Sequence, residues 1–189
     1  KTTRVDYSTS TAEMLEAGGN GDELCSNPTS SNPWSEPWCQ VMPTVTHVVK
    51  RVTESDNLSE AGRGARSYVT EYQYRDPVFE GRQREFRGFA RARAIRLGDA
   101  NSPTDITETQ FLLGECQDET PNGSGNADDV DDCSTPERWR DNPREALKGL
   151  PVVTEKYDAA GRYLSTDITQ YRLRHLYTGE DGRAVRQAV

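Results

Sequence analysis

Thiols and imidazoles are the side chains of this sequence best suited to hold a metal ion or to act in catalysis. The chain has two histidines, at positions 47 and 175, and four cysteines, Cys25, Cys39, Cys116 and Cys133. No two cysteines have the CxxC spacing of a zinc site, and the histidines are too few and too far from the thiols to complete one. No Ser-His-Asp, Cys-His or phosphate-loop pattern rises above chance. We therefore expect no metal, no cofactor and no enzyme activity.

The cysteines fall instead into two local pairs, each in a polar segment that contains Pro and Gly. Four cysteines allow three pairings, of which we favour Cys25 with Cys39 and Cys116 with Cys133. Each bond would close a loop of about 15 residues and contribute about 3 kcal/mol in the chain-entropy model. Four reduced thiols are the alternative. Disulfides would indicate an oxidising compartment or exposure after release.

Carboxylates offer two further chemistries, calcium binding and acid–base catalysis. The acidic cluster at 128–132, DDVDD, supplies hard oxygen ligands but lacks the alternating acids and glycine of an EF-hand. A solvated acidic loop is the simpler interpretation. A glycosidase needs two carboxyl groups about 5 to 9 Å apart in a cleft. The sequence singles out no such pair.

Arginines recur between positions 82 and 96, where they could bind nucleic acid or an acidic partner. The segment 87–90, RGFA, matches the first half of an RNA-recognition strand, but the aromatic residues needed for stacking do not follow. A formal net charge of −8, from 31 acids and 23 bases, also opposes binding to nucleic acid or anionic lipid. We expect a solvated or salt-bridged sheet face, with Asp76, Glu80 and Glu85 as partners and a buried Glu85–Arg pair setting strand register.

Two tryptophans, Trp34 and Trp38, lie in a segment rich in Ser, Thr, Asn, Gly and Pro. One interpretation is that they pin this segment to the body of the protein. The other is that they face a ligand and form a sugar-binding platform together with exposed tyrosines.

Strands are the elements predicted to position these side chains. Apolar residues alternate with a period near two, and turns come every 10 to 15 residues or so. This pattern predicts an all-β fold, an antiparallel sheet of long hairpins, with loop insertions at about 8–42 and 115–144. We expect residues 1–189 to form a single β domain that is a fragment of a larger protein. No apolar run approaches the roughly 20 residues of a membrane helix, so we expect no direct membrane insertion.

The central hairpin is predicted over residues 68–89. In YVTEYQY, at 68–74, the tyrosines share one face of a strand. Pro77 should end the pairing because it has no N–H, Glu80 and Gly81 should form the turn, and the return strand should run from Arg82 to about residue 97. Further strands are expected at 1–7, 44–53, 104–114, 151–157, 163–177 and 184–189, with short helices at 11–17, capped by Ser10 or Thr11, and at 145–149.

A compact turn is predicted at Tyr157-Asp-Ala-Ala-Gly-Arg-Tyr-Leu164. Asp158 can accept backbone N–H bonds, Gly161 can adopt positive φ, and Arg162 begins the return strand. A weaker copy follows at 177–183. The pattern YDxxGRxL resembles the core of the YD, or Rhs, repeat.

Four segments together resemble the middle region of the B component of the insecticidal toxin complexes and related virulence-plasmid proteins. They are HVVKRV at 47–52, YVTEYQY at 68–74, FEGRQREFRGF at 79–89 and ALKGLPVVTEKYDAAG at 146–161. The resemblance covers about 43–113 and 145–175, and the two cysteine-containing insertions depart from it. The family motif falls on positions that we interpret as packing and turn residues: Tyr72, Tyr74, Glu85, Phe86, Arg87, Gly88 and Phe89.

The resemblance implies a structural segment in the wall of a large hollow β-shell that encloses a toxic polypeptide before delivery. The partners would be the rest of the parent chain, other toxin-complex subunits or the enclosed toxin. The protein would be secreted or extracellular, as part of a bacterial toxin assembly. The alternative is a carbohydrate- or receptor-binding β module of a secreted protein that uses Trp34 and Trp38.

Overall fold

The computed structural model describes residues 1–16, 34, 38, 42–58, 66–99, 101–115 and 142–189. The elements follow in the order β1 (Thr2–Thr9), α1 (Ser10–Glu16), β2 (His47–Ser55), β3 (Ser67–Glu80), β4 (Glu85–Leu97), β5 (Asp105–Leu112), the 3₁₀ helix η2 (Pro143–Leu147), β6 (Leu150–Asp158), β7 (Tyr163–Ile168), β8 (Leu173–Thr178) and β9 (Ala184–Ala188). All four cysteines, the acidic cluster 128–132 and most of both insertions lie outside the described residues.

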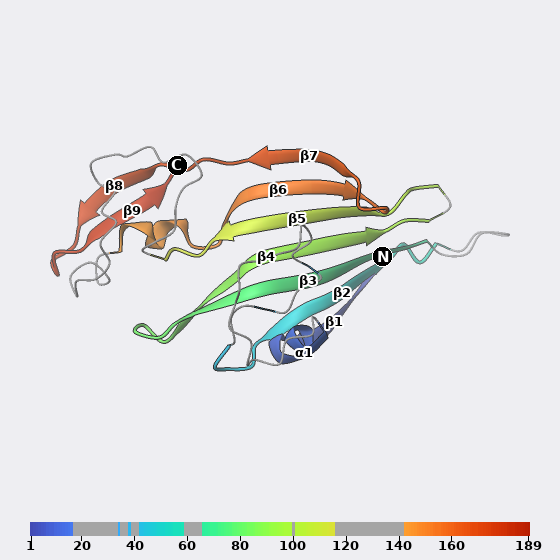
Figure 1. The fold of residues 1–189 in the computed structure, drawn as a ribbon, viewed down its shortest axis with the longest axis horizontal. Helices are drawn as coiled ribbons and strands as arrows, with labels where there is room; N and C mark the ends of the chain where they lie inside the picture. The colour runs from blue at the N-terminus through green and yellow to red at the C-terminus, as the bar shows by residue number, and fades with distance from the viewer. Residues whose placement is uncertain (17–33, 35–37, 39–41, 59–65, 100, 116–141) are drawn as a thin grey trace.

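One antiparallel sheet dominates the described part of the chain. Strands β1 to β7 lie side by side in sequence order, each paired with the next, and β8 and β9 form a separate two-stranded sheet (Figure 1). The long β3–β4 hairpin lies at the centre of the larger sheet. The predicted antiparallel all-β fold is therefore confirmed.

The helix α1 lies where the first insertion was expected to begin. Strand β1 extends to Thr9, whose hydroxyl accepts a hydrogen bond from Ala12 N at 3.2 Å, so Thr9 caps the helix in place of the predicted Ser10 or Thr11. Ser10 is instead buried, and its N–H donates to Thr46 O at 2.8 Å. The buried Glu13 accepts from Lys50 Nζ at 2.9 Å, which ties α1 to β2.

Pro77 does not end the strand, contrary to the sequence-based expectation. Strand β3 continues to Glu80, and Pro77 is buried opposite Phe89. Irregular backbone on both sides accommodates the missing N–H, since Asp76 has a φ of 53° and the register shifts between Val78 and Phe79. The return strand consequently begins at Glu85, after a turn over residues 81–84, and not at Arg82.

The single strand predicted at 163–177 is two strands. Strand β7 ends at Ile168, and β8 begins at Leu173 in the other sheet. Between them the backbone changes partners, since Thr169 N donates to Val152 O at 2.9 Å and Arg172 N donates to Val189 O at 2.9 Å. Alternation of side chains continues through such a change of partner, so the sequence pattern does not reveal it.

Among the described residues, a small buried apolar cluster lies at the junction of three elements. Leu112 of β5, Leu147 of η2 and Val152 of β6 form a buried cluster, with Tyr171 and Ala188 packed against it. A thin core of this kind agrees with a composition in which 33% of residues are hydrophobic. Within the described ranges, no helix is long and apolar enough to cross a membrane.

Candidate functional site

The aromatic residues of the family motif pack together on the central hairpin. The rings of Tyr74 and Phe89 have centroids 4.9 Å apart, and Phe86 meets Phe89 edge-on at 5.4 Å. The Tyr74 hydroxyl donates to Val49 O at 2.9 Å, and burial raises its pKa to about 12. Tyr72 lies two positions along the same strand, half-buried on the same face. These side chains join β2, β3 and β4 across the sheet.

Trp38 belongs to this aromatic group. Its side chain is 5% exposed and packs edge-on against Phe89 with ring centroids 5.7 Å apart. Trp38 is thus packed into the body of the protein, as the first of the two interpretations supposed, and does not present its ring to solvent.

Arg87 is a buried cation at the centre of a polar junction. Its side chain is 2% exposed. One terminal nitrogen, Nη1, donates to the carbonyl oxygens of Leu113 at 3.2 Å and Gly114 at 3.0 Å. The other, Nη2, donates to Gln83 Oε1 at 2.6 Å and lies 2.8 Å from Glu145 Oε2. Arg87 therefore joins the tip of the β3–β4 hairpin to the end of β5 and to η2, and its guanidinium is not free to bind a nucleic-acid phosphate.

Gly114 lies against this junction with little space around it. Its φ is 67°, and a Cβ added there would lie 2.9 Å from Lys148 Cβ and 3.1 Å from Arg87 Nη1. Asn142 Nδ2 also donates to Gly114 O at 2.6 Å. The two residues that flank segment 115–141 are thereby held together.

Glu85 pairs with a lysine and not with an arginine, contrary to the sequence-based expectation of a buried Glu85–Arg pair. Lys148 Nζ contacts Glu85 Oε1, which ties the start of β4 to the end of η2. Gly88 has a φ of 121° next to Leu113, and the register shift of the hairpin lies opposite it. The motif EFRGF is therefore a junction between the hairpin and the η2 region.

The turn between β6 and β7 has the hydrogen bonds predicted from its sequence. Asp158 Oδ1 accepts from the N–H groups of Ala160 and Arg162, both at 2.9 Å, and Arg162 Nε donates to Asp158 Oδ2 at 2.6 Å. Gly161 has a φ of 74°. The N–H bonds from Arg162, the largest cause, hold the pKa of Asp158 below its usual value.

The second copy of this turn uses the same backbone bonds with a different carboxylate. Gly179 N donates to Arg183 O at 2.8 Å and Gly182 N to Gly179 O at 3.0 Å, as Asp158 N does to Arg162 O and Gly161 N to Asp158 O. Gly179 has no carboxylate, and Asp181 replaces it by accepting from Arg183 N at 3.1 Å. The two turns therefore share a backbone path.

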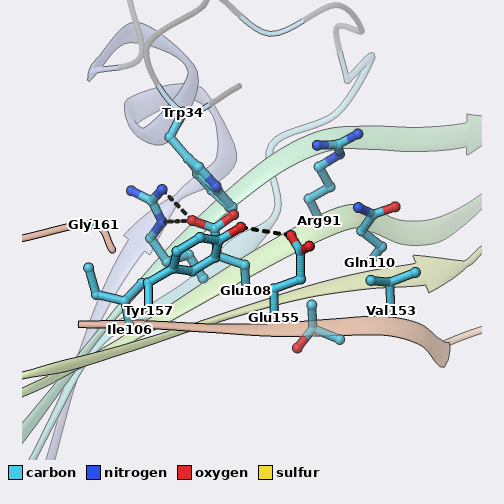
Figure 2. A pocket seen from close by; sticks show the side chains of 11 residues that line it. Trp34, Arg91, Ile106, Glu108, Gln110, Val153, Glu155, Tyr157 and Gly161 are labelled. Atoms are coloured by element: carbon cyan, nitrogen blue, oxygen red, sulfur yellow. Dashed lines mark hydrogen bonds and ion pairs between the residues drawn. The ribbon is translucent and has the colours of Figure 1, made fainter. Parts of the chain in front are cut away.

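A pocket lies on the sheet face over β4, β5 and β6 (Figure 2). Its volume is about 420 Å³. Strand register places its side chains in rows, with Arg93, Glu108 and Glu155 opposite one another in the middle row. The lining residues are Trp34, Arg91, Arg93, Ile106, Glu108, Thr109, Gln110, Val153, Glu155, Tyr157 and Gly161.

The charged groups of the pocket are held by hydrogen bonds. Arg93 Nε donates to Glu108 Oε1 at 2.9 Å. The Tyr157 hydroxyl donates to Glu155 Oε2 at 2.9 Å, and Figure 2 shows this bond across the pocket floor. Burial, and then the bond to Glu155, raises the pKa of Tyr157 to about 12. The phenol therefore stays protonated and keeps one carboxylate in a fixed orientation.

Trp34 lies over this row from the opposite side of the pocket. The guanidinium carbon of Arg93 lies 4.4 Å from the centroid of the Trp34 ring, a cation–π contact. Of the two predicted ligand-facing tryptophans, Trp34 thus lines a cavity and Trp38 does not.

Sequence reasoning did not find the carboxylates of the pocket. Glu108 and Glu155 are separated by a long insertion and by a strand connection, and only the register of β5 with β6 makes them neighbours. Their alternation within TETQ and TEKY indicates a common face for each strand but not their pairing. Across the described residues, no group of three or more side chains is arranged to hold a metal ion.

A family model described as the insecticide toxin TcdB middle/N-terminal region matches residues 1–118. The chain therefore belongs to this family. The match spans the first insertion, which the resemblance in the sequence had left out, and ends before the segment at 146–161. No curated protein matches the chain.

Solved structures share the fold. The crystal structure of TcdB2-TccC3-TEV matches with a TM-score of 0.61 at 16% identity, over 99% of this chain and 10% of that one. The Tc holotoxin pore of Photorhabdus luminescens, with a mutated TccC3, matches with a TM-score of 0.59 at 16% identity, over 99% of this chain and 9% of that one. TcdB2-TccC3 without its hypervariable C-terminal region gives 0.61 at 17%, with coverages of 99% and 10%. This chain spans about a tenth of those chains.

Proposed function

We propose that the chain is a structural wall segment of a toxin-complex B-type protein, and that it has no catalytic role. Within that protein it would form part of a β-shell that encloses a toxic polypeptide before delivery. Its partners would be the rest of the parent chain, the subunits of the complex and the enclosed polypeptide, in a secreted bacterial assembly. Membership of the TcdB middle/N-terminal family supports this role.

The observation that carries the proposal is the extended meander with its buried polar junction. Seven strands pair in sequence order into one wide sheet, and the buried apolar cluster among the described residues is small. Arg87 fixes the hairpin tip to η2 through carbonyl and carboxylate contacts. Side chains that hold strands in a fixed arrangement are suited to a structural wall. The solved structures with this fold contain TcdB2 together with TccC3, which suggests a TccC3-like partner.

The turns at 158–162 and 179–183 support a repeat of the YD type. They share backbone hydrogen bonds and a glycine with positive φ at the same place. A turn of this kind places a strand beside the preceding one with few connecting residues. A continuous meander of strands requires such turns. We propose that these are two copies of the repeat, the second with its carboxylate moved to Asp181.

Protease protection tests the enclosure. The longer protein that carries this chain would be co-expressed with its toxin-bearing partner and digested, and the fragments of the toxic polypeptide would be followed by mass spectrometry. We expect protection in the wild type, loss of protection in Arg87→Ala, and no loss in the exposed control Arg4→Ala. Protection that persists after deletion of residues 67–97 would contradict a wall role for this chain.

A further inference from the structure

The pocket on the large sheet has the size and lining of a small-molecule site, apart from any role of the sheet as a wall. Its volume of about 420 Å³ falls in the range of ligand pockets, about 300 to 1,000 Å³. Its lining combines an indole ring, a phenol, two aliphatic side chains and several polar groups. Such a mixture suits a ligand with both an apolar face and hydrogen-bonding groups.

The charges of the lining cancel. Arg91 and Arg93 contribute two positive charges, and Glu108 and Glu155 contribute two negative charges. A pocket of this composition has no net attraction for an anion or a cation. It favours a ligand that has no net charge and that can bond to both the hydrogen-bond donors and the acceptors of the lining.

The two glutamates occupy an arrangement that a plain wall has no reason to keep. Glu108 and Glu155 are directly opposite each other in the β5–β6 register. Like charges at such positions destabilise a sheet. Each carboxylate is held by other groups, Glu108 by Arg93, and Glu155 by the hydroxyls of Tyr157 at 2.9 Å and Thr166 at 3.3 Å. The pair thus presents fixed acceptor oxygens to the cavity at some cost to the stability of the sheet.

The aromatic rings complete the site. Trp34 lies on one side of the cavity, and Tyr157 lies on the sheet opposite (Figure 2). Aromatic faces pack against the apolar C–H face of a pyranose, and Glu, Arg and Gln side chains offer acceptors and donors to its hydroxyls. We infer that this pocket is a binding site for a neutral carbohydrate of one or two rings.

The experiment compares neutral and charged sugars on the same chain. Glucose, galactose, mannose and N-acetylglucosamine would be titrated into the full chain alongside glucosamine and glucuronic acid, with binding followed by saturation-transfer NMR and calorimetry. We expect saturable binding of at least one neutral sugar below about 10 mM, and weaker binding of its charged analogue. No saturable binding of any neutral sugar, or tighter binding of a charged analogue, would overturn the site.

Pocket variants locate the binding. Trp34→Ala and Glu155→Gln should each weaken binding roughly tenfold, since each removes a ring contact or a charged acceptor. Glu108→Gln is a second carboxylate variant for use if Glu155→Gln lowers stability. Tyr177→Ala changes an aromatic residue of β8 that is 59% exposed and is not part of the pocket lining, and should bind as the wild type does. Equal affinity in Trp34→Ala and the wild type would rule the pocket out as the place of binding.

This site does not depend on enclosure of a toxin. Protease protection of the toxic polypeptide would be unaffected by Glu155→Gln if the wall role is correct. Sugar binding would persist in the isolated chain if the wall role is wrong.

Discussion

Arg87 Nη1 donates to the carbonyl oxygen of Gly114 at 3.0 Å, across 27 positions of sequence. The bond joins the hairpin that carries the family motif to the point at which the chain leaves the sheet. Because Arg87 also bonds to Leu113 O and pairs with Glu145, one side chain holds three parts of the protein in place.

Arg87→Ala should therefore lower the free energy of unfolding by about 3 kcal/mol. The substitution leaves the buried carbonyls of Leu113 and Gly114 without their charged donor, whereas the half-exposed Glu145 can turn to water. Urea unfolding followed by circular dichroism measures the change. Arg4→Ala is the matched control, because Arg4 pairs with Asp6 at the surface and should contribute less than about 1 kcal/mol. Equal losses in the two variants would contradict a special role for Arg87.

Gly114→Ala and Gly149→Ala separate backbone strain from lack of space. Both glycines have positive φ, 67° and 77°, so each alanine carries the left-handed strain of about 1 to 2 kcal/mol. A Cβ at position 149 meets nothing within 4 Å, whereas one at position 114 meets Lys148 Cβ at 2.9 Å. We expect Gly114→Ala to be clearly the more destabilising in urea titrations. A smaller loss of unfolding free energy at position 114 than at position 149 would show that the residues around Gly114 move easily to make room for a Cβ.

The sequence predicts the strands better than it predicts their ends and partners. Alternation in 68–74 and the acid and glycine of 158–161 identify the hairpin and the turn, because both depend on local geometry. Pro77 was expected to stop β3, but the left-handed Asp76 beside it allows the strand to continue. This accommodation of Pro77 depends on pairing with the neighbouring strand, so the local sequence alone does not predict it.

The pocket was harder to predict for the same reason. Trp34 stood out as a residue type, but its position over Arg93 is a contact between residues far apart in the sequence. Glu108 and Glu155 look like ordinary solvent-facing strand residues until β5 and β6 are paired. Contacts between residues that are distant in the sequence, and not propensities, make the site.

Alkaline titration should show late ionisation of the phenols of Tyr74 and Tyr157. Burial is the main cause that raises the pKa of Tyr74 and of Tyr157 to about 12. Because the folded-state pKa is raised, the contribution of each protonated phenol to the free energy of unfolding is complete below about pH 10, the unfolded value. This contribution is lost as pH rises toward 12. Absorbance at the phenolate wavelength measures the ionisation. Tyr74→Phe and Tyr157→Phe should each remove one late phenol, and an unchanged late phase in both would refute the assignment.

Asp158→Ala should destabilise the β6–β7 turn at neutral pH and less so in acid. The backbone N–H of Arg162 is the main cause that lowers the pKa of Asp158, so the stabilisation is present above the unfolded value and is lost as pH falls through the folded one. The gap in melting temperature between wild type and variant should therefore narrow as pH falls below about 4. A gap that stays constant over this range would show that the charge of Asp158 does not matter.

The cysteine pairs remain a prediction because they lie outside the described residues. We expect non-reducing peptide mapping to find Cys25 joined to Cys39 and Cys116 joined to Cys133. Reduction should then lower stability by up to about 3 kcal/mol for each loop that is opened. Free thiols at all four positions would remove both the loop closures and the inference of an oxidising compartment.

Asn142 Nδ2 donates to the carbonyl oxygen of Gly114 at 2.6 Å, and this contact makes the segment between the two residues a place to insert foreign sequence. Because this bond joins a residue just after β5 to the residue just before η2, the two ends of the intervening segment are held together directly. Ring closure becomes costlier by only about 0.6 kcal/mol for each doubling of loop length. We therefore expect a fluorescent reporter or an affinity peptide inserted between Gly114 and Asn142 to leave this bond in place.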